Sequence, residues 1–252
     1  MKYIKFENQN NEALYGILEN GSVKEISGEL FGEHTQTDNE YNLEDIHVLP
    51  VCSPSKIVAI GLNYRDHAEE MGKDLPAEPR MFLKPGTAVI GHGDEIVYPD
   101  HMSSHVDYEG ELAVVIGKKA KDVEESDALS YVFGYTCHND ITARDLQARD
   151  IQFTRGKGFD TFAPIGPVIE TELDAGNADI STYLNGELKQ NSNTSNLIFN
   201  IPALVSFISK VMTLLPGDII STGTPAGVSP MNRGDVVEVK ITGIGTLKNH
   251  IV

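Results

Sequence analysis

The stretch Asp-Tyr-Glu-Gly-Glu at residues 107–111 leads directly into the apolar run Leu-Ala-Val-Val-Ile at 112–116. The apolar run is typical of a buried β-strand, and side chains two apart on a strand point to the same face, so Glu109 and Glu111 are expected to lie side by side. Two buried carboxylates at this separation repel each other unless a cation neutralises them. A site made of oxygen ligands, without Cys or His, favours magnesium or manganese over zinc. The alternative is an exposed edge strand with a solvated acidic face.

A third carboxylate follows the next predicted strand. Residues 131–139 are rich in aromatic and β-branched side chains, which is typical of a strand, and Asp140 comes directly after them. The segment 141–147 is predicted to be a helix with Asp140 or Thr142 near its N-cap. Asp140 therefore either joins the two glutamates in a metal site or simply caps this helix.

Arg144 and Gln147 follow Asp140 by four and seven residues, so a helix would present them on roughly the same face. A guanidinium group suits a substrate carboxylate because it can donate two parallel hydrogen bonds, and a metal ion beside it suits a carbonyl or enolate oxygen. A surface ion pair of Arg144 with Asp140 or Asp145 is the alternative.

A His–Glu pair lies further upstream. After the apolar run 57–60, the chain is expected to turn at Gly61 and to enter a short helix that carries His67 and Glu70 on one face. A carboxylate beside an imidazole orients the ring and keeps its accepting nitrogen ready to act as a general base. The polar, proline-containing stretch 72–79 would let this helix move as a lid. The alternative is an ordinary surface pair.

Composition limits the class of protein. The chain has 252 residues, of which 40% are hydrophobic, so it can form a full core as one large domain or as one large and one small domain. The 23 glycines and 12 prolines, with short apolar runs between them, indicate a β-rich chain. The net charge of −17 disfavours nucleic acid and anionic membranes as partners. An anionic substrate therefore needs a local positive patch, for which the metal, Arg144 and Lys157 are the candidates.

Cysteine usage and the N-terminus indicate a cytoplasmic protein. Cys52 and Cys137 form no Cys-x-x-Cys motif and lie near apolar sequence, so we expect free thiols in a reducing compartment. The first residues contain no apolar region of signal-peptide length, and no apolar run approaches the roughly 18 residues of a membrane span.

Other elements are predicted from periodicity. Helices are expected at 123–129, at 142–153 and from Asn200, and the segments 235–241 and 246–248 are expected to pair as a hairpin. The third helix has Asn200 as its cap, Pro202 in its first turn and a repeating apolar stripe. That stripe consists of Leu204, Ile208, Val211 or Met212, and Leu215.

Six blocks of the sequence, in order, together resemble the fumarylacetoacetate hydrolase family. They are Gly-Leu-Asn-Tyr-Arg-Asp-His at 61–67, Phe-Leu-Lys-Pro at 82–85, Asp-Tyr-Glu-Gly-Glu at 107–111, Asn-Asp-Ile-Thr-Ala-Arg-Asp-Leu-Gln at 139–147, Arg-Gly-Lys-Gly-Phe-Asp at 155–160 and Ser-Thr-Gly-Thr-Pro-Ala-Gly-Val at 221–228. The resemblance implies an α+β, β-rich fold, namely a β-roll of mixed sheets with a few short helices. It also implies a small N-terminal β domain at 1–53, a catalytic domain at 54–252, and a homodimer.

The resemblance also assigns roles to residues. It implies metal ligands at Glu109, Glu111 and Asp140 for Mg²⁺, with Mn²⁺ or Ca²⁺ as alternatives, and a base with its carboxylate partner at His67 and Glu70. It places Lys157 near the metal, and Arg144, Gln147 and Thr224 in contact with the substrate. The residues themselves support the role of Lys157, because flanking glycines let it reach inward, where its ammonium would offset the acidic cluster.

The implied function is a metal-dependent enzyme for small anionic 2-oxo or β-diketo acids, acting through an enolate that the metal stabilises. Because His67 would activate a water, hydrolytic carbon–carbon cleavage of acylpyruvate-type substrates is the expected reaction. The same enolate serves oxaloacetate decarboxylation and the isomerisation of 5-carboxymethyl-2-hydroxymuconate or 2-hydroxyhepta-2,4-diene-1,7-dioate, so these reactions are alternatives. A catalytically idle 2-oxo-acid-binding protein is a further alternative, although such a protein would be expected to have lost a ligand or the base.

Overall fold

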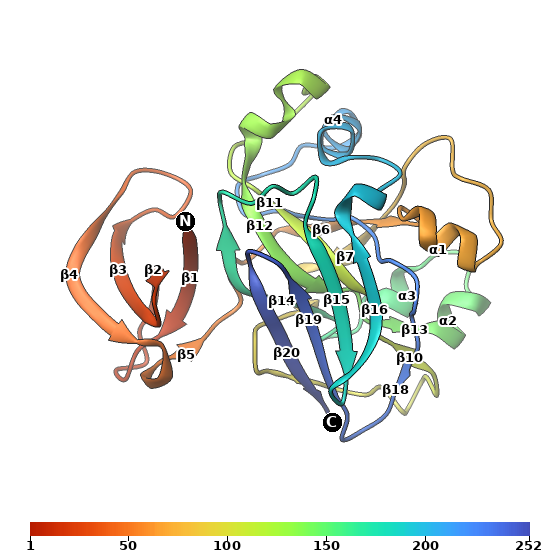
Figure 1. Ribbon diagram of the computed structural model, residues 1–252, viewed down its shortest axis with the longest axis horizontal. Coiled ribbons are helices and arrows are strands. Elements are labelled where there is room, and N and C mark those ends of the chain that lie inside the picture. Colours follow the sequence, from red (N-terminus) through yellow and green to blue (C-terminus); the bar gives the residue numbers. More distant parts are fainter.

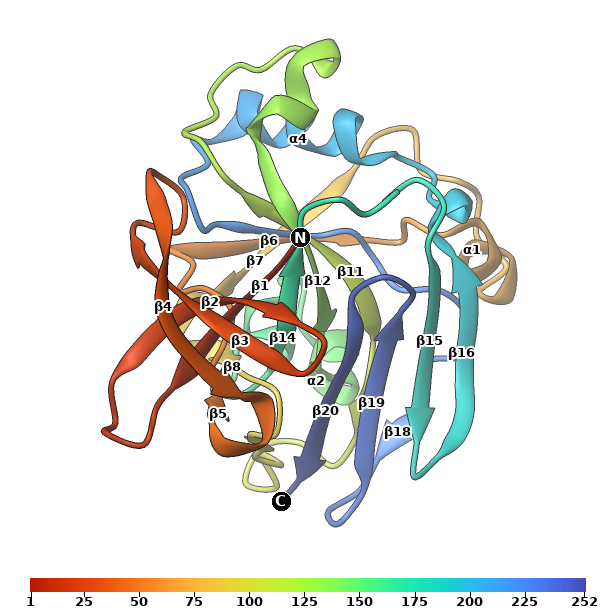
Figure 2. The ribbon, with the colours of Figure 1, turned by 60° about the vertical axis from the view of Figure 1, so that its left-hand side comes forward.

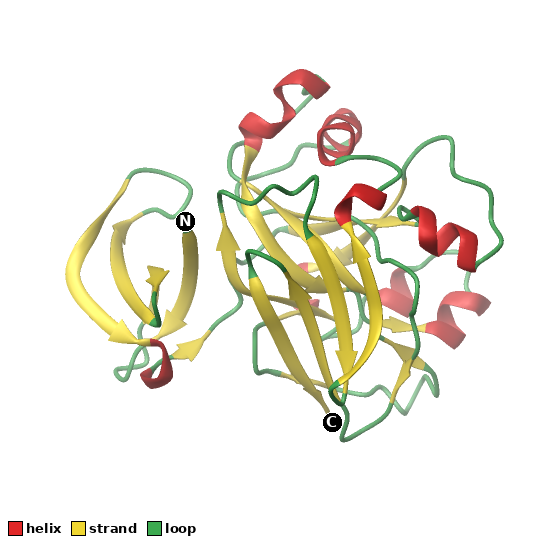
Figure 3. Cartoon of the chain, viewed as in Figure 1, coloured by secondary structure: helices red, strands yellow, loops and turns green.

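Strands dominate the chain, as Figure 3 shows for this computed structural model, which describes residues 1–252. The strands are β1 (Lys2–Glu7), β2 (Ala13–Glu19), β3 (Ser22–Gly28), β4 (His34–Asn42), β5 (His47–Val48), β6 (Lys56–Gly61), β7 (Arg80–Pro85), β8 (Val89–Ile90), β9 (Glu95–Ile96), β10 (Val106–Asp107), β11 (Gly110–Ile116), β12 (Val132–Asn139), β13 (Thr142–Ala143), β14 (Ala163–Glu170), β15 (Asp179–Leu184), β16 (Glu187–Asn193), β17 (Ile219–Ser221), β18 (Pro230–Met231), β19 (Val236–Ile241) and β20 (Gly245–Ile251).

The helices are few and short, and most lie at the periphery of the sheets (Figure 3). The α-helices are α1 (Arg65–Glu70), α2 (Arg144–Arg149), α3 (Thr154–Lys157) and α4 (Ile201–Val211), and the 3₁₀ turns are η1 (Leu43–Asp45), η2 (Gly86–Ala88), η3 (Glu125–Tyr131) and η4 (Thr194–Asn196). Even α4, the longest, has 11 residues, and no helix combines the length and apolarity needed to cross a membrane.

The strands form three sheets. The largest has 12 strands in the order β4-β3-β2-β1-β14-β12-β11-β17-β6-β7, with β5 paired to β1 and β8 paired to β14. A second sheet runs β16-β15-β19-β20-β9, and a third runs β13-β10-β18. Most neighbours are antiparallel, but β17 with β6, β14 with β8 and β20 with β9 are parallel. The expected β-rich α+β fold of mixed sheets is therefore confirmed.

Strands β1–β5 lie to one side of the larger body, in red to orange in Figures 1 and 2. They are joined to it through the large sheet, because β1 pairs antiparallel with β14, with Lys2 opposite Glu170. The predicted C-terminal hairpin is present as β19 and β20. Both cysteines are buried as free thiols.

Strand β11 is central and buried on both faces. Leu112, Val114 and Ile116 belong to the largest apolar cluster, whereas Ala113 and Val115, which alternate with them, belong to a second one. None of these side chains is solvent-exposed. The alternative of an exposed acidic edge strand is therefore wrong, and the carboxylates at the start of β11 lie inside the protein.

Helix α4 begins as predicted but ends early. The Asn200 side chain accepts a hydrogen bond from the Ala203 N–H at 2.9 Å, and Pro202 lies in the first turn. The helix stops at Val211, so Leu215 does not continue the apolar stripe and is 41% exposed. The cause is tertiary pairing: Leu214 forms a bridge with Ala120 and is buried in place of Leu215.

The predicted helix at 142–153 is wrong at its start and at its end. Thr142 and Ala143 form β13, which pairs with β10, so α2 begins only at Arg144. The residues 150–153 then separate α2 from α3. Neither Asp140 nor Thr142 caps α2, whose N-cap position is Ala143 without a side-chain hydrogen bond. The helix predicted at 123–129 is instead the 3₁₀ turn η3, which covers Glu125–Tyr131.

Candidate metal and catalytic site

Three buried carboxylates converge where β11 begins and β12 ends. One oxygen each of Glu109, Glu111 and Asp140 lies within 4.8 Å of the others. The register explains the convergence, since β11 and β12 are antiparallel with Gly110 opposite Asn139, so the residues around this pair meet at one end of the sheet. The three acids that sequence reasoning selected are therefore adjacent in space.

Two buried lysines hold Asp140 in place. Lys157 Nζ lies 2.6 Å from Asp140 Oδ2 and 2.7 Å from Glu109 Oε2, and Lys84 Nζ lies 2.5 Å from Asp140 Oδ1. Burial opposes ionisation of Asp140, but the ammonium groups of Lys157 and Lys84 outweigh it and keep the pKa of that carboxyl well below its usual range. Lys157 thus contacts two members of the acidic trio, and Lys84 is a second cation at Asp140 to which no role was assigned from the sequence. The available signal was the lysine of the Phe-Leu-Lys-Pro block, one of the six blocks that carry the family resemblance.

Glu111 differs from its two neighbours because it has no cationic partner. It accepts hydrogen bonds from the Ser221 hydroxyl and, at 2.8 Å, from the Gly223 N–H. Burial, together with the nearby charges of Asp140 and Glu109, raises the pKa of Glu111 to about 8. The cluster therefore has more acidic groups than its own cations can keep ionised. An all-oxygen donor set of this kind fits Mg²⁺ or Mn²⁺.

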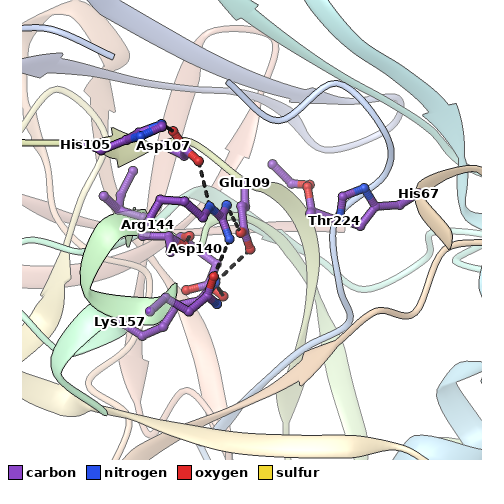
Figure 4. Close-up of polar contacts among 12 residues, drawn as sticks. His67, His105, Asp107, Glu109, Asp140, Arg144, Lys157 and Thr224 are labelled. Atoms are coloured by element: carbon purple, nitrogen blue, oxygen red, sulfur yellow. Dashed lines mark hydrogen bonds and ion pairs between the residues drawn. The ribbon is translucent and has the colours of Figure 1, made fainter. Parts of the chain in front are cut away.

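All three arms of the Arg144 guanidinium bind protein groups (Figure 4). Its Nε donates to Asp107 Oδ2 at 2.7 Å, its Nη2 to Glu109 Oε1 at 2.5 Å and its Nη1 to Gln147 Oε1 at 2.5 Å. The expected alternative pairing with Asp140 or Asp145 is wrong, because β10 brings Asp107 next to α2. Asp107 belongs to the opening motif, yet its role in holding Arg144 was missed.

His67 and Glu70 form the predicted pair on α1, with Nδ1 and Oε2 at 2.9 Å. The Gly227 N–H also donates to Glu70 Oε1 at 3.1 Å, and Arg65 donates to the Leu197 carbonyl at 2.7 Å. These contacts tie α1 to two distant loops. Figure 4 shows His67 across the site from Lys157, with Glu109 between them in that view.

A cavity of about 310 Å³ brings most of the predicted site residues together. Eight of the nine line it, and Glu70 is the exception. The lining also includes residues that were not predicted to belong to the site: Ile60, Gly61, Leu62, Met71, Lys73, Arg80, Phe82 and Phe153. The Thr224 hydroxyl donates to the Gly110 carbonyl at 2.9 Å and accepts from Gln190 Nε2 at 2.8 Å, so its own proton is already engaged.

Replacing Lys84 with methionine tests how much its buried ion pair with Asp140 contributes to stability. The change leaves Asp140 with Lys157 as its one remaining cation, so the free energy of unfolding is expected to fall by about 2 kcal/mol. Urea denaturation of the variant and the wild type measures the difference. Lys210→Met, which removes an exposed partner of Glu124, is the control and should change stability by less than about 0.5 kcal/mol. An equal loss in the two variants would contradict the role given to Lys84.

Comparison with known proteins gives two family matches. Residues 56–252 match the family described as fumarylacetoacetate (FAA) hydrolase C-terminal, and residues 1–50 match the family described as Rv2993c-like, N-terminal. Among curated relatives, oxaloacetate tautomerase YisK from Bacillus subtilis is 46% identical over 84% of this chain and 75% of its own length.

Solved structures agree with this assignment. The 2-hydroxyhepta-2,4-diene-1,7-dioate isomerase from Mycobacterium marinum is 41% identical, with a TM-score of 0.93 over 100% of this chain and 98% of its own. The fumarylpyruvate hydrolase from Pseudomonas aeruginosa in complex with Mn²⁺ and pyruvate is 34% identical, with a TM-score of 0.75 over 86% of this chain and 92% of its own. The motifs, the fold and these matches agree: the chain belongs to the fumarylacetoacetate hydrolase family.

Proposed function

We propose that this protein is a divalent-metal-dependent enzyme that isomerises small 2-oxo acids by moving a proton between carbon and oxygen, as in keto–enol interconversion of oxaloacetate. One observation carries the proposal: Glu109, Glu111 and Asp140 open into the same cavity as His67. Relatives named as an oxaloacetate tautomerase and a dienedioate isomerase support isomerisation over the hydrolysis expected from sequence.

The acidic trio would hold Mg²⁺ or Mn²⁺, which as a Lewis acid would polarise the 2-oxo group and make the hydrogens on C3 more acidic. Lys84, Lys157 and Arg144 keep Glu109 and Asp140 in position through the ion pairs described above, and the Ser221 hydroxyl and the Gly223 N–H hold Glu111. The burial of these groups excludes bulk water from the floor of the cavity, so their charges act in a low dielectric.

His67 is the proposed base. The Glu70 carboxylate is an acceptor only, so in their 2.9 Å contact the proton lies on His67 Nδ1 and Nε2 is free to accept another. Nε2 would take a proton from C3 and return it to the enolate oxygen, or the reverse, so no atom is gained or lost. Arg144 and Gln147 are proposed to contact the substrate from the opposite wall.

Hydrolytic cleavage of acylpyruvates is the second candidate, because the same His67–Glu70 pair could deprotonate a water. The name of the Pseudomonas aeruginosa neighbour, a fumarylpyruvate hydrolase, favours this candidate. Decarboxylation of oxaloacetate would form the same enolate. The acidic trio therefore fits all three reactions, and rate measurements distinguish them.

A side-by-side assay on one purified sample tests the proposal. Oxaloacetate enol–keto conversion, oxaloacetate decarboxylation and acetylpyruvate cleavage are measured with Mg²⁺, with Mn²⁺ and with a chelator, after subtraction of the buffer rates. We expect the enol–keto conversion to have the highest kcat/KM and to be lost with the chelator. A higher kcat/KM for acetylpyruvate would favour the hydrolase, and no turnover in any assay would favour an idle binding protein.

A further inference from the structure

The cations at the floor of the cavity have no net charge left for a second anionic group of the substrate. Lys84 is paired with Asp140, Lys157 with Asp140 and Glu109, and Arg144 with Glu109 and Asp107. The chain as a whole has a net charge of −17, so it attracts anions only where positive charge is left unbalanced.

Two other cationic side chains line the same cavity, and no carboxylate neutralises them. Lys73 and Arg80 are exposed, and neither takes part in any ion pair of the chain. Lys73 lies three residues after the end of α1, on the proposed lid, whereas Arg80 is the first residue of β7 and is held by strand pairing. Arg80 pairs there with Gly61 of β6, which also lines the cavity.

Strand β7 connects Arg80 to the acidic trio. Arg80, Phe82 and Lys84 alternate along the strand and therefore project from one face. Their exposure falls along it: Arg80 is exposed, Phe82 is half-buried and Lys84 is fully buried against Asp140. This face of β7 thus runs from exposed Arg80 in the cavity lining to Lys84, which lies behind the lining residue Asp140.

The middle of this face is apolar. The Phe82 ring packs edge-on against Phe153, with centroids 5.5 Å apart, and lies 5.2 Å from Lys157 Nζ. Both aromatic rings line the cavity. A hydrocarbon chain that leaves the trio toward Arg80 would therefore pass aromatic surface before it meets a charge.

We propose that Arg80, assisted by Lys73, is a specificity-determining residue that binds a second, distal carboxylate of the substrate. The proposal rests on the proposed function and names, as its preferred substrates, dicarboxylic 2-oxo acids with a longer carbon chain than oxaloacetate. Lys84 lies four positions after Arg80, so their Cα atoms are ~13 Å apart along the strand. That span leaves room for several carbon atoms between the 2-oxo acid end and the distal carboxylate.

A matched pair of ligands tests the assignment. 2-Oxoadipate and 2-oxohexanoate share a six-carbon chain and the 2-oxo acid end, and they differ only in the terminal carboxylate. Dissociation constants are measured by calorimetry on the full chain with saturating Mn²⁺, with pyruvate as the short reference ligand. We expect the wild type to bind 2-oxoadipate at least about tenfold more tightly than 2-oxohexanoate, as a charge-assisted hydrogen bond predicts.

Substitutions test which residue causes the preference for 2-oxoadipate over 2-oxohexanoate. Arg80→Gln should reduce it to about twofold or less, and Arg80→Lys should restore part of it because a positive charge remains. Lys118→Gln removes one positive charge from an exposed position outside the cavity and should leave the ratio unchanged. If pyruvate binds but the wild type shows no preference, or Arg80→Gln keeps it, the assignment of Arg80 is wrong. If no 2-oxo acid binds with Mn²⁺, including pyruvate, the proposed function itself fails.

Discussion

Glu111→Gln is expected to abolish stabilisation by Mn²⁺ and to lower turnover at least about 100-fold. Removing a residue that only hydrogen-bonds to a metal ligand costs up to about 100-fold, so removing a ligand itself should cost at least as much. A ligand that binds the folded state alone stabilises it by about 2.7 kcal/mol at a hundredfold excess over Kd. For a chain of this size, that corresponds to a rise in Tm of roughly 5–10 °C in the wild type. The variant should show almost none of this rise.

Glu111 is the best member of the trio to replace because it has no ion pair to break. Glutamine keeps the volume and an acceptor oxygen for the Ser221 hydroxyl and the Gly223 N–H. Replacing Glu109 would instead leave Lys157 and Arg144 without a partner, so lost stability and lost metal binding could not be separated.

Thermal unfolding with and without Mn²⁺ measures the effect. Glu125→Gln, an exposed acid on η3, is the matched control and should keep both the rise in Tm and the turnover. A full Mn²⁺-dependent rise in Glu111→Gln would show that the ion binds elsewhere.

His67→Ala is expected to lower enol–keto conversion and acylpyruvate cleavage by about 10²- to 10⁴-fold, the usual contribution of a positioned general base. The Mn²⁺-dependent rise in Tm should persist, because His67 is not one of the three converging carboxylates. Decarboxylation of oxaloacetate should fall less, since it needs neither an activated water nor a proton removed from carbon.

Rates for the three reactions, measured on one preparation of the variant, separate these roles. Glu70→Gln should give a smaller loss, because the amide oxygen can still accept the Nδ1 proton but stabilises an imidazolium less well. His250→Ala, at an exposed position on β20, is the control. An equal loss in all three reactions of His67→Ala would contradict the assignment of His67 to proton transfer.

Local sequence patterns predicted the parts of the site whose residues are close together in the chain. Glu109 and Glu111 were identified because side chains alternate along a strand; Glu111 is on β11, and Glu109 directly precedes it. His67 and Glu70 were identified because a helix brings residues three apart together, and α1 does so. The β-rich fold also followed from the sequence, because short apolar runs between turn residues favour strands.

Partners that are far apart in the chain were decided only by the tertiary structure. Lys84 reaches Asp140 across 56 residues, and Asp107 holds Arg144 across 37. Helix α2 likewise begins at Arg144 rather than at the predicted residue 142, because Thr142 and Ala143 pair with β10. A local pattern determines on which face of a strand or helix a side chain lies, but the pairing of distant strands determines which residues that face contacts. That is why the two glutamates could be predicted from the sequence alone, whereas the pairing of Lys84 with Asp140, the pairing of Arg144 with Asp107 and the unpaired Arg80 in the cavity lining could not.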